Sequence, residues 1–147
     1  MEYAALRKDR LGDLISYLVK NKNVMAPVDL GNNNYSFKRI NSADEIALKY
    51  IPTILPPKKY FMPVMENLLE FNVSAGQQVN AVIDFEKVIL FGVHTCDLAG
   101  IQCLNMVFSD KPKDINYLIR RNKITIIGLE CNDYCDEYAS CNLMGNH

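Results

Sequence analysis

Apolar residues recur every three or four positions in three stretches of the chain. These residues are Leu11, Leu14, Ile15 and Leu18 in the first stretch, Leu98, Ile101, Leu104 and Phe108 in the second, and Ile115, Leu118 and Ile119 in the third. The spacing predicts three amphipathic helices, the first of which ends near residues 21–23. Each helix would bury one face against the rest of the protein.

Other apolar segments predict strands. Residues 24–28 and 35–40 flank the sequence GNNN at 31–34, whose composition favours a turn and therefore a hairpin. Pro27 predicts an edge position for the first of these strands, because proline has no amide N–H to donate to a neighbouring strand. The run at 88–93 is apolar throughout, which is typical of a strand that is covered on both faces.

A further apolar strand is predicted at 124–129, after the two C-terminal helices. The order strand, helices, strand is that of a crossover unit, whose strands are parallel and whose connection is right-handed. We therefore expect an α/β or α+β fold, with a mixed sheet, a C-terminal parallel βαβ unit and a hairpin-rich N-terminal half. No stretch rich in glycine or serine divides the chain, so residues 1–147 are interpreted as a single domain.

The middle of the chain has weaker signals. Ser42 and Glu45 have the spacing of a capping box, whereas the residues that follow alternate as in a strand, so the type of this segment stays open. The sequence PPKKYFMP at 56–63 predicts an extended connector, because each proline disfavours helix in the residue before it. A short helix is expected to follow at 64–71.

Composition narrows the functional classes. The chain has 147 residues and a formal net charge of −1, with 49% hydrophobic and 22% charged residues. It has neither the composition of a disordered segment nor the basic charge of a phosphate-backbone binder, so no nucleic-acid role is expected. Residues 1–10 contain no apolar core of a signal peptide, and no apolar run approaches the ~18 residues of a membrane span. We therefore expect a cytoplasmic protein.

Four of the five cysteines lie in two loops, each of which follows a predicted strand. Cys96 follows the first strand of the crossover unit, and Cys131, Cys135 and Cys141 follow the second. Parallel neighbouring strands end at the same edge of a sheet, so the two loops are expected to meet where open α/β folds place their ligands. In a reducing compartment, cysteines clustered in loops favour metal ligation or redox chemistry over structural disulfides.

Four thiolates can hold a cubane iron–sulfur cluster, which is the first interpretation of Cys96, Cys131, Cys135 and Cys141. Cys96 is expected at the N-terminus of a helix, whose dipole and free amides would lower the pKa of the thiol. Tetrahedral zinc accepts the same four ligands in a purely structural site. A metal-free interaction domain with reduced thiols is the third interpretation.

Two further residues of this region have candidate roles. His94, two residues before Cys96, is a candidate hydrogen-bond donor to a cluster sulfur or a substitute ligand. Cys103 lies among apolar residues of a predicted helix and is interpreted as a small thiol in the core. The sequence has no Ser/His/Asp arrangement, no G-x-G-x-x-G motif and no Walker loop, so neither a hydrolase nor a nucleotide site is expected.

The motifs around the cysteines resemble those of a known family. They are FGVHTCDL at 91–98, RR at 120–121, IGLEC at 127–131, CNLMG at 141–145 and, earlier in the chain, PKKYF at 57–61. In this order and spacing they are similar to the iron–sulfur electron-transfer subunits of anaerobic sulfite reductases and to the related β subunits of cytoplasmic sulfhydrogenases. The resemblance spans most of the chain.

The resemblance implies a non-catalytic, electron-transfer component of an oxidoreductase complex. Such subunits hold 4Fe-4S clusters and relay electrons between a flavin-containing or ferredoxin-like partner and the catalytic subunit. The cysteines that carry over by position are Cys96, Cys131 and Cys141. Members of the family usually have a Cys-x-Cys pair before the Met-Gly, whereas here Ala139 stands at the first of these positions, so Cys135 is assigned as the fourth ligand.

The chain departs from the family in two other ways. Members have arginine or a similar residue, commonly followed by proline, where this chain has His94 and Thr95. They also normally continue into a ferredoxin-like region with further cysteine quartets, whereas this sequence stops just after Met144 and Gly145. We therefore expect either the N-terminal domain of a longer protein or a short relative whose ferredoxin part is a separate chain.

Overall fold

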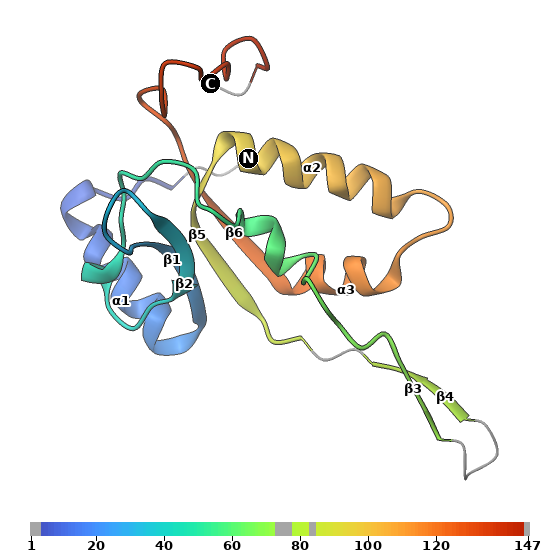
Figure 1. Cartoon of the computed structure of the whole chain (residues 1–147). Helices are drawn as coiled ribbons and strands as arrows, with labels where there is room; N and C mark the ends of the chain where they lie inside the picture. Colours follow the sequence, from blue (N-terminus) through green and yellow to red (C-terminus); the bar gives the residue numbers. More distant parts are fainter. Residues whose placement is uncertain (1–3, 73–77, 83–84, 146–147) are drawn as a thin grey trace.

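The computed structural model describes residues 4–72, 78–82 and 85–145. Its centre is a four-stranded sheet in the order β2-β1-β5-β6 (Figure 1). The strands are β1 (Asn23–Asp29), β2 (Tyr35–Arg39), β5 (Val88–His94) and β6 (Ile124–Leu129). β1 and β2 are antiparallel, whereas β5 is parallel to both of its neighbours. The mixed sheet with a C-terminal parallel crossover, predicted from the sequence, is confirmed.

Helices cover both faces of this sheet (Figure 1). α1 (Leu11–Asn21), preceded by the 3-10 turn η1 (Lys8–Arg10), lies on one face, and α2 (Thr95–Ser109) and α3 (Ile115–Lys123) lie on the other. The three predicted helices are therefore confirmed. Within β5, Phe91 packs into the core beneath α1, and Leu90 packs into the core beneath α2 and α3. This two-sided burial explains why the sequence of β5 is apolar throughout.

The hairpin of β1 and β2 confirms the predicted turn. Asn32 and Asn33 have φ angles of 52° and 57°, a left-handed conformation that asparagine tolerates. The edge position predicted for Pro27 is wrong, because β1 lies between β2 and β5. Only residues 23–25 of β1 pair with β5, so Pro27 lies beyond the parallel ladder and its missing N–H interrupts none of those pairs.

The segment that follows β2, residues 40–68, is tied to β2 and to the core. The predicted capping box is present at the start of η2 (Ala43–Glu45), and residues 46–50 are neither helix nor strand. Next comes the 3-10 helix η3 (Pro57–Tyr60), so the extended conformation predicted for the connector at 56–63 is wrong over these four residues. Lys59 Nζ and the Tyr60 hydroxyl both donate to the backbone oxygen of Phe37, at 3.0 and 2.9 Å. These bonds fasten the connector against the central sheet.

A second sheet, of two strands, projects away from the central one (Figure 1). It consists of β3 (Leu69–Asn72) and β4 (Gln78–Ala81), which are antiparallel, and we call this hairpin the arm. The helix predicted at 64–71 is wrong, because residues 64–68 form no helix and the following residues form β3. α3 holds the segment that enters the arm, because Arg120 contacts Phe61 and Glu66 ahead of β3.

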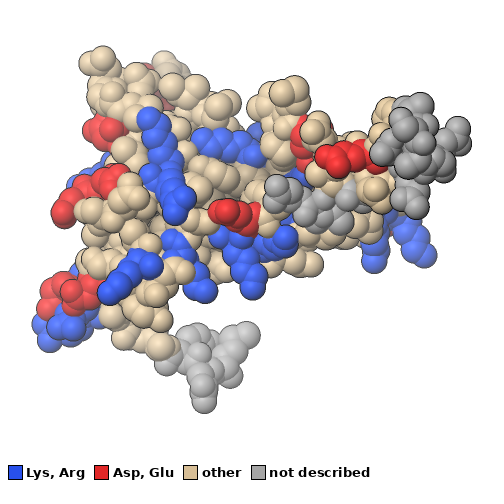
Figure 2. All heavy atoms as spheres, turned by 90° about the horizontal axis from the view of Figure 1, so that it is seen from below, with Lys and Arg blue, Asp and Glu red and all other residues tan. Residues whose placement is uncertain are grey.

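The surface charges are mixed. On the face shown in Figure 2, the Lys and Arg side chains lie among neutral and acidic ones and do not merge into one continuous patch. This distribution agrees with the formal net charge of −1. Within the described residues, no helix is both long and apolar enough to cross a membrane.

Candidate functional site

The two cysteine-bearing loops leave from the same edge of the central sheet. β5 and β6 are parallel and end in register, because the last pair of the ladder joins His94 to Leu129. Cys96 is two residues beyond His94, and Cys131 is two residues beyond Leu129. The expectation that the loops meet at one edge is therefore confirmed.

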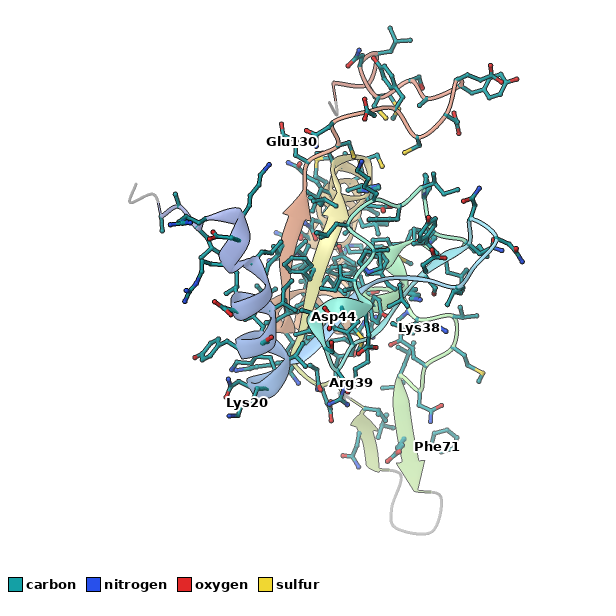
Figure 3. The ribbon with its side chains drawn as sticks, turned by 90° about the vertical axis from the view of Figure 1, so that its left-hand side faces the viewer. Lys20, Lys38, Arg39, Asp44, Phe71 and Glu130 are labelled. Atoms are coloured by element: carbon teal, nitrogen blue, oxygen red, sulfur yellow. The ribbon has the colours of Figure 1, made fainter. Side chains whose placement is uncertain are left out.

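Close packing of α2 against β6 brings the two loops together. A side chain at Gly128 would lie only 3.0 Å from Leu98 Cδ1, so the absence of a side chain there lets the first turn of α2 approach β6. Cys96 is the second residue of α2. The loop at 130–145, which carries the other three cysteines, contains turns but no helix or strand, and Glu130 marks its beginning in Figure 3.

The thiols are close enough to influence one another's ionisation. Burial, the charge of Asp97, and the thiols of Cys141 and Cys131 raise the pKa of Cys96. Burial and the thiols of Cys131 and Cys141 likewise raise the pKa of Cys135. The lowered pKa expected for Cys96 at a helix N-terminus is wrong for the metal-free chain: the backbone bond at Asp97 does lower it, but burial has the larger effect.

The thiols share one edge without forming a closed ligand set. Among the described residues, no group of three or more His, Cys, Asp or Glu side chains is arranged so that it could hold a metal ion. Cys96, Cys131, Cys135 and Cys141 are all partly buried and free, and as ligands they stay a prediction. Cys103 is exposed on α2, so the core position predicted for it is wrong.

His94 and Tyr50 form a stacked pair beside the thiols. The two rings lie 3.8 Å apart between centroids, with an angle of 16° between their planes. The Tyr50 hydroxyl donates to the backbone oxygen of Gly92 at 2.7 Å, and burial raises the pKa of Tyr50. Burial lowers the pKa of His94 and so favours the neutral imidazole. Tyr50 was missed in the sequence, where its only signal is an alternation with Ile46 and Leu48.

A cavity of about 350 Å³ opens next to this pair. The residues that line it include Tyr35, Leu48, Tyr50, His94, Cys131, Tyr134 and Cys135. Across Cys131, a second hollow of about 540 Å³ lies between α2 and β6. Cys131 therefore borders both cavities, and the one that it shares with Tyr50 is lined by aromatic, aliphatic and polar residues together.

The four thiols fit a sulfur-ligated metal group by their chemistry, although their arrangement in the structure is open. Four thiols are the donor set of a cubane cluster and also of a structural zinc ion. The Nδ1 atom of His94 is buried and, among the described residues, has no hydrogen-bond partner. Thiols with raised pKa values are protonated in the metal-free chain, so a bound metal would have to displace their protons, and its affinity would fall in acid.

Comparison with known proteins identifies a relative. No family model matches the chain, and no solved structure matches it. Sulfhydrogenase 2 subunit beta of Pyrococcus furiosus is 35% identical to the chain over 145 residues, which are 99% of the chain. The chain spans 42% of the length of that subunit. The predicted resemblance to a sulfhydrogenase β subunit is thereby confirmed, because the chain is similar to this subunit over nearly its whole length.

Proposed function

We propose that this chain is an electron-transfer module of a cytoplasmic multi-subunit oxidoreductase, and that Cys96, Cys131, Cys135 and Cys141 hold one 4Fe-4S cluster. The observation that carries the proposal is the register of β5 and β6, because it starts the Cys96 loop and the loop with the other three cysteines from one edge of the sheet. The similarity to a sulfhydrogenase β subunit supports a redox role. Flavin-containing, ferredoxin-like and catalytic subunits are the proposed partners.

The four proposed ligands differ in how firmly the backbone holds them. The ends of β5 and β6 fix the backbone positions of Cys96 and Cys131, because both follow directly from paired strands. Cys135 and Cys141 belong to a loop without regular structure, which can adjust its path when the ligands close around the group. The cluster supplies one-electron transfer when bound, and no bond-making step is proposed for the chain.

The charge around the thiols would influence the potential of the cluster. Glu130, Asp133, Asp136 and Glu137 are exposed on the same loop, and residues 130–145 contain no Lys or Arg, although Lys49 lines the neighbouring cavity. Negative charge near an iron–sulfur cluster disfavours the added electron and so lowers the reduction potential. We therefore propose that the module works at the low-potential end of its complex.

The first test is the metal content of the protein after anaerobic purification and reconstitution with iron and sulfide. The proposal predicts a brown protein with about four iron and about four sulfide per chain, as a cubane cluster requires. A colourless protein with stoichiometric zinc would support the structural-zinc interpretation instead. A colourless protein that binds neither metal would support a metal-free interaction domain.

The second test assigns the fourth ligand. Replacing Cys135 by serine is expected to remove most of the bound iron, because serine does not replace thiolate in a four-thiolate site. Cys103→Ser is the matched control: Cys103 is exposed on α2 and lies outside the proposed ligand set. Full iron in Cys135→Ser, or loss of iron in Cys103→Ser, would overturn the assignment.

A further inference from the structure

His94 ends β5 with its side chain inside the protein. The residue is only 5% exposed, and its Nδ1 atom has no hydrogen-bond partner within the part of the chain that the structure describes. His94 also stands at the N-cap position of α2, but its side chain makes no capping bond there. Buried polar atoms without partners are rare in native proteins, and each usually marks a water, ion or ligand that satisfies it.

Stacking fixes the orientation of the imidazole. The ring lies 3.8 Å from the ring of Tyr50, and the Tyr50 hydroxyl is itself held by the backbone oxygen of Gly92. The stack therefore fixes the plane of the imidazole, and in this plane Nδ1 meets no partner among the described residues. Nδ1 is closed off from solvent, so a bound group can reach it only when the irregular loop at 130–145 rearranges around that group.

The same ring borders the candidate centre. His94 lines the cavity of about 350 Å³ together with Cys131 and Cys135, and it precedes Cys96 by two residues. The ionisation of Tyr50, which stacks on His94, is influenced by the thiols of Cys96 and Cys131. His94 and three of the four proposed ligands therefore belong to one neighbourhood.

We propose that His94 is a positioning residue that donates a hydrogen bond from Nδ1 to a sulfur atom of the bound 4Fe-4S cluster and so raises its reduction potential. The inference rests on the proposed function. Sulfur atoms of a cluster carry more negative charge after reduction, so a hydrogen bond to them stabilises the reduced state more than the oxidised state. The plain alternative is a cavity that holds water, which would satisfy Nδ1 without touching the cluster.

The test replaces His94 by phenylalanine, which keeps a ring to stack on Tyr50 and removes the nitrogen. The reconstituted variant is expected to keep its iron and to have a lower potential. One lost hydrogen bond should shift the reduction equilibrium about tenfold, which is about 59 mV for a one-electron couple. The electron paramagnetic resonance spectrum of the reduced cluster should change as well. His94→Gln, which keeps a donor, should recover part of the potential.

A second readout separates this role from simple packing. In the metal-free chain, His94→Phe should unfold at the same temperature as the wild type or higher, because it removes an unpartnered buried nitrogen. A clearly lower midpoint would mean that His94 acts through folding, and it would overturn the inference.

The remaining outcomes are equally decisive. An iron-loaded His94→Phe with an unchanged potential would overturn the inference and leave the proposed function standing. If His94→Phe loses its iron, recovery of iron and potential in His94→Gln supports the inference, and failure of that recovery contradicts it. A wild-type chain that binds no iron would contradict both proposals.

Discussion

At the scale of single residues, Gly92 determines how β5 reaches the site. The ladder between β5 and β6 pairs Phe91 with Ile127 and Val93 with Gly128, so Gly92 is an extra residue in β5. Its φ of 80° is a left-handed conformation that glycine adopts without strain. Such a bulge re-aims the residues that follow it, and here it brings the end of β5 into register with the end of β6.

Replacing Gly92 by alanine is expected to destabilise the chain by about 1–3 kcal/mol. The left-handed backbone costs an L-residue about 1–2 kcal/mol, and the new Cβ would lie 3.3 Å from Pro27 Cδ. Gly100→Ala in α2 is the control, because a Cβ there meets nothing within 4 Å and alanine favours helix by about 0.5–1 kcal/mol. Urea unfolding measures both, and a Gly92→Ala variant as stable as the wild type would contradict this account of the bulge.

At the scale of elements, the helices and strands that could be predicted from the sequence are those whose buried residues recur at regular intervals. β5, β6 and the helices face the core on one or both sides, and the spacing of their apolar residues follows from this burial. Residues 64–71 show helical spacing too, but β3 pairs with β4 there, and pairing with a distant segment leaves no local signal. The position of Cys103 on α2 was mispredicted for another reason. Apolar residues of this helix, such as Met106 and Val107, are themselves exposed, so apolar neighbours do not indicate that Cys103 is buried.

The candidate site was predictable only in part. The order of the strands is enough to place two loops at one edge, so the proximity of the Cys96 and Cys131 loops could be inferred from that order alone. The stack of Tyr50 on His94 could not, because it joins residues 44 positions apart through a segment without regular structure. Tertiary contacts of this kind are invisible to periodicity.

α3 anchors the arm through an ion pair that should be measurable. Arg120 Nε donates to the Phe61 oxygen at 2.7 Å, and the guanidinium pairs with Glu66; the two side chains are 10% and 31% exposed. Glu66→Ala leaves a largely buried cation without its carboxylate and is expected to cost about 1–3 kcal/mol. Glu66→Ala should cost much less stability when Arg120 has already been replaced by methionine. Urea unfolding of the wild type, the two single variants and the double variant gives the coupling energy.

The exposed pair Arg10–Asp13 provides the control for that cycle. Its side chains are 65% and 69% exposed, so Asp13→Ala should change the free energy of unfolding by no more than about 0.5 kcal/mol. A coupling between Arg120 and Glu66 as small as this would mean that the arm is not anchored there.

At the scale of the whole molecule, the arm stands apart from the packed body. Leu69, Phe71 and Val79 share one face of its two strands and are 59%, 72% and 61% exposed. In Figure 3, Phe71 lies at the end of the molecule opposite Glu130 and the candidate site. A lone two-stranded sheet is only marginally stable in water, and the buried residues that form the two cores all come from other elements.

Replacing Phe71 in the arm and replacing Phe61 in the body are therefore expected to change the free energy of unfolding by very different amounts. Phe71→Ser removes an exposed ring and is expected to change the free energy of unfolding by less than about 0.5 kcal/mol. Phe61→Ala empties a fully buried position between η3 and α3 and is expected to cost about 3–5 kcal/mol. Urea unfolding compares the two, with hydrogen exchange of the arm amides as a second measurement. A Phe71→Ser variant destabilised as strongly as Phe61→Ala would show that the arm folds back onto the body in solution, because only a buried ring can contribute that much.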